Sequence, residues 1–440
     1  MRPRALPGLV TLLAIAAWPL PAARAQQPRS AWGRVSFFGN TASSTGTSGS
    51  SAAFSELIGT FTFESATGGT APLEYRADLR LAGYPGMDNR ARRVSIYDAF
   101  LGVRFAEGRA GLRLGQMWLN DLGGLGSVGG VSFEVRQPSR LESGRWRAGA
   151  FGGLEPKIME AGYVEDVLKA GALVAYDGVG ARRHVLGFVH VRDRGRTERS
   201  VLVTTNFLPV GKEFFLYQSA EYDIAGAGIE GAGSLTYWFT NARYSPTGRV
   251  ELQGSYHRGR SIDSRTIIRD QLDGRPVDPR AVEGLRFESA TGRVTVTVAR
   301  GLRVFGGYGR DRNNREDSAS GRVTYGFFAA DAAGSGLDLS AADSRLQGAD
   351  GRSFNSWYLS VGRTLARRLY LTGDYGSSLS VYRFVSASGF VIENRPRTRR
   401  AALSGLLTLP HGASVLTTLE RVKDDDITQT RIMSGLSYRF

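Results

Sequence analysis

Apolar and polar residues alternate along nearly the whole chain with a period of two. The clearest stretch is "LEYRADLRL" at 73–81, where odd-numbered positions are apolar and even-numbered positions are charged. Successive side chains of a β-strand point to opposite faces of the sheet. This stretch is therefore expected to form a strand with one apolar face and one charged face.

The same alternation recurs in "GRVELQGSYH", "GRVTVTVAR" and "RRLYLTGDYG", and less strictly in "SELIGTFTFE", "RAGLRLGQMW", "ERSVLVTTNF" and "ASVLTTLERV". These segments run for about nine to twelve residues, which suits a tilted membrane strand of ~9–11 residues. Strands of soluble domains are more often ~5–6 residues long. After the first residues, no stretch shows the period of a long amphipathic helix.

The connections between these segments are of two kinds that alternate along the chain. Short ones include "AEGR", "PVGK", "ARGL", "TLARR" and "LPHGA", and long polar ones cover 84–93, 120–130, 259–287 and 312–352. Tight turns at one end and wide loops at the other are typical of outer-membrane barrels. The chain is therefore predicted to be all-β, a transmembrane antiparallel up-and-down β-barrel with short periplasmic turns and long extracellular loops.

Counting hairpins gives about 20 strands, within a range of 18–22, and the first strand is expected near Trp32. The stretch 315–330 contains "GRVTYGFFAA", which alternates like a strand. Including it alone would break the up-and-down order. It is therefore assigned to a hairpin above the membrane.

The N-terminus has the features of a signal peptide. A basic start, Met1–Arg4, precedes the apolar run "LPGLVTLLAIAAW", and Ala23 and Ala25 place small residues two apart. The run is shorter than the ~20 residues of a spanning helix, which disfavours a membrane anchor. We expect cleavage after Ala25, with 1–25 as the signal peptide and 26–440 as one barrel domain in the bacterial outer membrane.

Composition narrows the chemistry. The chain has no Cys and four His, so disulfides and thiolate metal sites are excluded, and no metal or cofactor is expected. The formal charge is +15, and loss of Arg2, Arg4 and Arg24 would leave about +12. An exported basic protein is not expected to bind nucleic acid. Its expected partners are outer-membrane lipid, lipopolysaccharide phosphates and anions in a pore.

The last nine residues, "IMSGLSYRF", end on an aromatic residue. Phe440, Tyr438 and Gly435 match the C-terminal signature of bacterial outer-membrane β-barrel proteins, which this chain resembles, although Met433 stands where the family usually has a polar residue. The resemblance implies that the barrel assembly machinery recognises this signature. The same residues could equally serve as aromatic girdle residues at the membrane interface.

The polar faces of the expected strands should line the lumen. The residues predicted to face it are Glu74, Arg76, Asp78, Arg80, Asp98, Arg104, Arg113, Arg145 and Arg147. An excess of unpaired Arg would favour anions in the pore. Alternatively, Arg and acidic side chains could pair across strands and only hold the wall together.

A porin-like channel for passive diffusion of small polar or anionic solutes is the function we expect. The Gly-rich segment 120–130 is faintly similar to the third loop of substrate-specific porins, and such a loop could fold inward and narrow the lumen. No motif specifies the solute. A plugged transporter is disfavoured because no plug domain precedes the first strand.

The sequence leaves two alternatives to a channel. The chain could be a non-conducting surface barrel whose long loops contact lipopolysaccharide or a partner. It could also be a barrel acyl hydrolase, with Ser255 and His257 as its nearest candidates, but Gly259 stands where that family places its Ser. We therefore expect no enzymatic activity.

Overall fold

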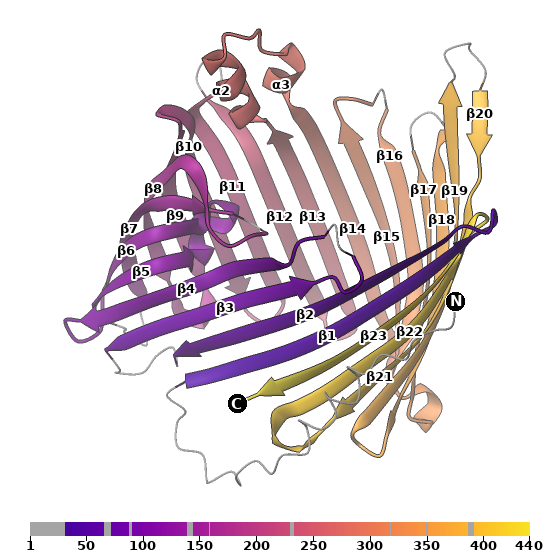
Figure 1. Ribbon diagram of the computed structural model, residues 1–440. Helices are drawn as coiled ribbons and strands as arrows, with labels where there is room; N and C mark the ends of the chain where they lie inside the picture. The colour runs from indigo at the N-terminus through magenta and orange to yellow at the C-terminus, as the bar shows by residue number, and fades with distance from the viewer. Residues whose placement is uncertain are drawn as a thin grey trace.

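The computed structural model describes residues 31–65, 72–87, 90–138, 144–157, 159–228, 233–316, 318–348, 351–385 and 391–440. In them the chain forms an all-β, antiparallel, closed up-and-down barrel of 22 strands (Figure 1). The predicted signal peptide, 1–25, lies outside the described residues. Within the described part of the chain, no helix is both long and apolar enough to cross a membrane.

The first half of the wall consists of β1 (Ala31–Gly46), β2 (Ser51–Ser65), β3 (Leu73–Gly83), β4 (Arg93–Phe105), β5 (Ala110–Trp118), β6 (Ser127–Arg136), β7 (Arg145–Pro156), β8 (Tyr163–Asp177), β9 (Arg183–Asp193), β10 (Arg196–Val210) and β11 (Phe214–Gly226). The second half consists of β12 (Ser234–Thr247), β13 (Val250–Ser261), β14 (Leu285–Ala299), β15 (Leu302–Asn313), β16 (Ser320–Ala329), β17 (Leu337–Gln347), β18 (Ser353–Leu365), β19 (Leu369–Val385), β21 (Arg397–Thr408), β22 (Ala413–Lys423) and β23 (Ile427–Arg439). The short strand β20 (Val391–Asn394) pairs only with the far end of β19, outside the wall.

Within the residues that the structure describes, helical segments occur only in connections between strands. They are the 3₁₀ turns η1 (Asn120–Gly126), η2 (Val179–Ala181), η3 (Ala332–Gly334) and η5 (Pro410–Gly412), and the helices α2 (Ser264–Leu272) and α3 (Pro279–Glu283). We call the end of the barrel that carries turns such as 106–109 and 366–368 the turn end. The opposite end, the loop end, carries the connections that contain η1, α2 and α3.

The first and last strands close the barrel. β1 pairs with β2 on one side and with β23 on the other. At the seam between β1 and β23, Ser36 donates a 2.9 Å hydrogen bond to Ser437. The backbones of Gly33 and Phe440 exchange two further hydrogen bonds. The first strand begins at Ala31, close to the predicted start near Trp32.

The strand number is 22, where the sequence predicted about 20. The difference lies in 312–352, which the sequence pattern predicts to be one long loop but which contains the wall strands β16 and β17. The assignment of 315–330 to a hairpin above the membrane is therefore wrong, because β16 lies in the wall. In β17, "LDLSAADSRLQ", Ser, Ala and Asp interrupt the alternation. Its place in the wall comes from continuous pairing with β16 and β18, which the pattern of one strand does not reveal.

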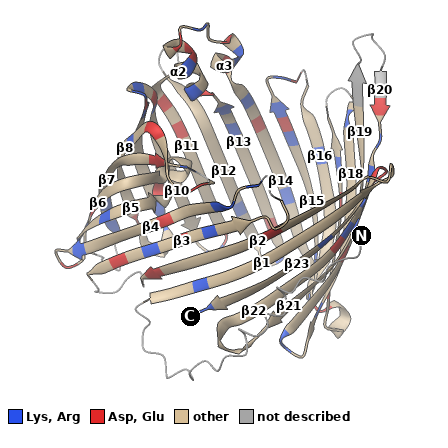
Figure 2. Ribbon diagram, viewed as in Figure 1, with Lys and Arg blue, Asp and Glu red and all other residues tan. Residues whose placement is uncertain are grey.

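The two faces of the wall differ as the alternation predicts. On β4 and β5 the side chains of Leu101 and Leu114 are 64% and 67% exposed, whereas Asp98 on the opposite face of β4 is 6% exposed. Apolar side chains that point out of a closed barrel remain uncovered, so the exposed leucines mark the outer wall. Charged residues of both signs are distributed along the strands and in the α2–α3 segment (Figure 2).

Candidate functional site in the barrel lumen

The 3₁₀ turn η1 folds from the loop end onto the inner wall of the barrel. It connects β5 and β6 but contacts β9 and β10. Thr205 of β10 donates a hydrogen bond of 3.5 Å to the carbonyl of Asp121, and Leu122 is fully buried. Of the Gly-rich segment 120–130, which the sequence analysis expected to fold inward, residues 120–126 do so, whereas 127–130 belong to the wall strand β6.

Glycine makes this inward fold possible at two places. The Cβ of any larger residue at Gly187 of β9 would lie 2.3 Å from the Leu122 side chain, so Gly187 provides the seat for Leu122. Gly123 within η1 has a φ of +57°, which glycine adopts without steric cost. The Leu119 N–H also donates to the Gly126 carbonyl at 2.9 Å and closes the loop.

The inner wall beneath η1 is apolar, contrary to the simple rule of a polar interior. Its buried residues come from β8, β9 and β10 and comprise Val167, Leu173, Ala175, Val185, Val189, Val191, Val201 and Val203. The outer face of the same strands is also apolar, as the 60% exposure of Leu186 shows. Near-continuous apolar runs such as "HVLGFVHV" were the sequence signal for this second buried face.

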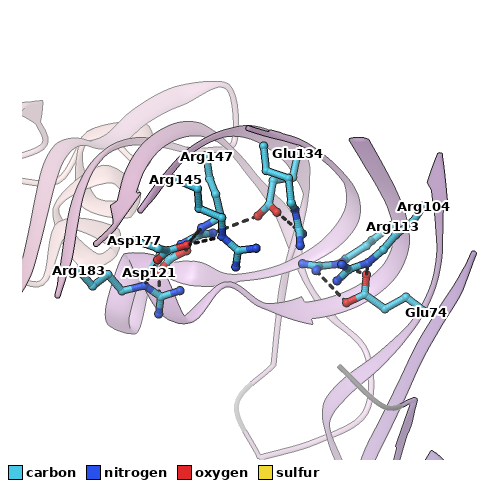
Figure 3. Close-up of polar contacts among 10 residues, drawn as sticks. Glu74, Arg104, Arg113, Asp121, Glu134, Arg145, Arg147, Asp177 and Arg183 are labelled. Atoms are coloured by element: carbon cyan, nitrogen blue, oxygen red, sulfur yellow. Dashed lines mark hydrogen bonds and ion pairs between the residues drawn. The ribbon is translucent and has the colours of Figure 1, made fainter. Parts of the chain in front are cut away.

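Arg147 of β7 is the centre of a network of ion pairs below η1. The side chain is 7% exposed and lies 3.0 Å from Asp121 of η1, 3.1 Å from Glu134 of β6 and 2.7 Å from Asp177 of β8. One guanidinium thus links three carboxylates from the loop and from both neighbouring strands. Arg183 of β9 also contacts Asp121, at 3.4 Å, and Asp177, at 3.0 Å (Figure 3).

A second group of ion pairs lies beside the first. Glu74 of β3 contacts Arg104 at 3.2 Å and Arg113 at 2.9 Å (Figure 3). Arg113 also lies over the ring of Phe100. Two arginines therefore share one carboxylate. Further pairs join Arg136 to Glu134 and Arg145 to Asp177.

Together these side chains form what we call the arginine cluster. It comprises six arginines, Arg104, Arg113, Arg136, Arg145, Arg147 and Arg183, and four carboxylates, Glu74, Asp121, Glu134 and Asp177. The arginines line a cavity of about 600 Å³ near the turn end, below η1. Because cations outnumber anions by two within the cluster, this part of the wall carries positive charge.

The other predicted lumen residues have different surroundings. Arg76 lies 3.4 Å from Glu64 and 3.3 Å from Asp98, and Asp98 accepts a 2.8 Å hydrogen bond from the Trp118 backbone. Asp78 accepts a 3.5 Å hydrogen bond from Thr62. Arg80 forms no ion pair with any residue that the structure describes. The cluster therefore contains five of the predicted lumen residues, Glu74, Arg104, Arg113, Arg145 and Arg147. The other four, Arg76, Asp78, Arg80 and Asp98, lie on β3 and β4 closer to the loop end.

The sequence did not reveal a second charged site, at the loop end. Arg265 of α2 lies 2.7 Å from Glu155 of β7 and 3.0 Å from Glu198 of β10, and Ile267 and Ile268 of α2 are buried. Asp263 caps α2, and hydrogen bonds from Thr266 hold its pKa below the usual range. Ion pairs and apolar packing thus fasten α2 to the rim, contacts that depend on residues about 70 and 110 positions away.

The three residues of the C-terminal signature lie at the seam between β23 and β1. The Phe440 ring stacks on Phe63 at 6.1 Å and on Tyr438 at 6.0 Å. A Cβ at Gly435 would lie 2.1 Å from the Phe38 ring, so glycine leaves room for that ring. The residues therefore have structural contacts of their own, and recognition by the assembly machinery stays a prediction.

Ser255 and His257, the nearest hydrolase candidates, do not contact each other through a hydrogen bond. The His257 ring packs against Tyr237, Phe239 and Phe287. Ser255 instead shares a 2.6 Å hydrogen bond with Thr291. A serine nucleophile needs a hydrogen bond to its base, and this pair lacks it.

Comparison with known proteins gives distant similarities of fold. No protein-family model and no curated protein matches the sequence. The solved structure of OpdQ of Pseudomonas aeruginosa is 10% identical, with 94% of this chain and 99% of that chain covered and a TM-score of 0.43. OccAB4 of Acinetobacter baumannii is also 10% identical, with the same coverage and a TM-score of 0.45.

The translocation pore of the P pilus usher PapC is similar at the same level. It is 13% identical, with 92% of this chain and 99% of that chain covered and a TM-score of 0.42. We therefore infer function from the geometry of this chain alone.

Proposed function

We propose that the protein is a porin-like channel of the bacterial outer membrane, through which small polar or anionic solutes diffuse passively. The observation that carries this proposal is the contrast between the two faces of the closed wall. Exposed leucines, valines and aromatic residues point outward, and charged residues that form ion pairs point inward.

The outer wall supports a membrane location. In water, an apolar belt of this extent would be a strong liability for aggregation. In a bilayer, the same belt is what a barrel presents to the lipid. The signal peptide predicted at 1–25 would direct export, and the C-terminal signature would direct insertion by the barrel assembly machinery.

The size of the barrel supports a channel. Barrels of ~16–18 strands already enclose water, and this wall has 22 strands. The turn η1 and the side chains below it occupy part of one side of the lumen, so η1 narrows the path. The arginine cluster lies beside that narrowing, and its excess positive charge would favour anions.

Conductance of the purified protein in planar bilayers tests the proposal. We expect stepwise insertion events with a stable conductance, and a larger conductance after residues 120–126 are replaced by a short Gly-Ser linker. Protein that was unfolded by heating and added at the same concentration is the control. Absence of conductance in both the natural chain and the shortened one would contradict the channel and favour the non-conducting surface barrel.

A further inference from the structure

Four basic side chains cluster on the outer wall near the loop end of β21 and β22. They are Arg397, Arg399, Arg421 and Lys423, and all four are exposed. Their face is fixed by their neighbours on β21, because Leu403 is 58% exposed and Ala402, on the opposite face, is 8% exposed. We call this group the outer basic cluster.

The register of the two strands brings like charges together. Arg399 lies directly opposite Lys423, and Arg421 lies opposite Ala401, one position farther along the same face. Like charges directly opposite each other on a sheet are destabilising. Such an arrangement is favourable when an anion from outside the chain binds between them.

Carboxylates of the described chain do not form ion pairs with the cluster. On the inner face of the same strand, by contrast, Arg400 forms a 2.9 Å ion pair with Glu420. Three aspartates follow Lys423 in the loop 424–426, and two of their carboxylates accept hydrogen bonds from backbone N–H groups. Asp425 accepts from Arg397, and Asp424 accepts from Asp426 and Ile427.

An apolar surface begins directly below the cluster. Leu403, Leu419 and Ile432 lie side by side in register on β21, β22 and β23, and their side chains are 58%, 47% and 52% exposed. Thr428 and Thr430 stand opposite Lys423 and Arg421 on β23 and add hydroxyl groups to the same face. Cations and hydroxyl groups therefore border a surface that suits acyl chains.

We propose that the outer basic cluster binds the phosphate groups of a phosphorylated glycolipid of the outer leaflet, the lipid A part of lipopolysaccharide. Arg and Lys form strong charge-assisted hydrogen bonds with phosphate oxygens. The adjoining leucines would contact the acyl chains of the same molecule, a combination that free phosphate cannot use. The proposal rests on the membrane location given under the proposed function.

Binding of defined lipids to the folded barrel in nanodiscs tests this proposal. The probes are bis-phosphorylated lipid A, the same lipid without phosphates, and inorganic phosphate. The test variant carries Arg399→Gln and Lys423→Gln. The control variant carries Arg92→Gln and Arg93→Gln, which removes the same charge from an exposed loop-end segment elsewhere on the barrel.

We expect the test variant to bind bis-phosphorylated lipid A roughly tenfold more weakly than the natural chain, and the control variant to bind it unchanged. The lipid without phosphates should bind all proteins equally weakly, and inorganic phosphate should not compete at millimolar concentration. Equal affinity of the test and control variants would overturn the proposal, as would competition by inorganic phosphate.

Folding and conductance are measured on the same samples. If the double variant does not fold, Arg399→Gln alone replaces it and should show a smaller loss in the same direction. Conductance should be unchanged in the test variant, because the cluster lies outside the lumen. A protein that conducts without this lipid preference would contradict the lipid site alone, and one that binds the lipid without conducting would contradict the channel alone.

Discussion

Neighbouring residues of a wall strand meet opposite surroundings, as Leu79 and Arg80 of β3 illustrate. Leu79 pairs in register with Phe61 on the outer wall, and Arg80 points to the inside. Arg on the lipid face costs ~2–4 kcal/mol near the bilayer midplane. We therefore expect Leu79→Arg to lower the free energy of unfolding by about that amount and Arg80→Leu to change it much less.

Urea unfolding of the two variants in lipid vesicles measures this difference. The reverse order of the two losses would show that the inner and outer faces have been assigned the wrong way round, and equal losses would contradict the predicted difference between the faces.

At the C-terminus, Phe440 combines backbone pairing with ring contacts. Its backbone pairs with Gly33 of β1, and its ring stacks on Phe63 and Tyr438. We expect Phe440→Ala to lower the amount of folded barrel in the membrane, because the ring contacts at the closing seam are lost. Gel mobility before and after heating reports the folded fraction, and Phe440→Tyr should restore it. A natural yield from Phe440→Ala would refute the prediction.

At the scale of single residues, the sequence predicted which face of a strand a side chain lies on, but not which residues it contacts. Alternation gave the charged face of β3 and β4 without any structure, because parity along a strand is a local property. The partners of those charges were not predictable. Arg147 is surrounded by carboxylates from η1, β6 and β8, and only the register of three strands and an inward-folded loop bring these together.

At the scale of elements, η1 is the connection on which the proposed channel function depends most. Its Leu122 is fully buried over Gly187 of β9. We expect Gly187→Val to displace η1 from the inner wall, since the new side chain occupies the position of Leu122. The displaced loop should widen the path and make single-channel currents larger and noisier than those of the natural chain.

Single-channel recordings of Gly187→Val and Gly292→Val provide the comparison. Gly292 of β14 has open space where a Cβ would lie, so its variant is a matched control and should behave like the natural chain. Identical recordings from both variants would contradict the claim that η1 is held on the inner wall by the packing of Leu122 over Gly187.

Two elements, β17 and α2, could not be predicted from the sequence pattern. Strands with a strong apolar face, such as β3 and β14, were predictable from the alternation of apolar and polar residues in their sequence. β17 was missed because Ser, Ala and Asp dilute its alternation, and α2 was missed because nine residues with a modest apolar stripe resemble a polar loop. Both are stabilised by contacts with elements that lie next to them only in the folded chain.

For the whole molecule, the balance of charge inside the barrel would determine which ions pass through the proposed channel. The arginine cluster has two more cations than carboxylates, and on β3 the charges of Arg80 and Asp78, neither of which forms an ion pair with a described residue, offset each other. The excess of two remains when all the ion pairs of the cluster are counted. The natural chain should therefore prefer chloride to potassium, although the ion pairs keep the preference modest.

Neutralising lumen arginines should change this preference in a defined direction. In a variant with Arg76→Gln, Arg80→Gln and Arg113→Gln, the carboxylates of Glu64 and Asp98 lose Arg76, and Glu74 retains only Arg104. These carboxylates would attract cations, so the preference should move toward potassium.

The zero-current potential across a bilayer with a KCl gradient tests the central claim most directly. It reports whether the barrel conducts and which ion its lumen prefers. For the natural chain we expect a potential of the sign given by chloride permeation, and for the triple variant a potential shifted toward that of potassium. A potassium-selective natural chain, or a barrel that carries no current even after 120–126 is removed, would contradict the account of an anion-preferring channel narrowed by η1.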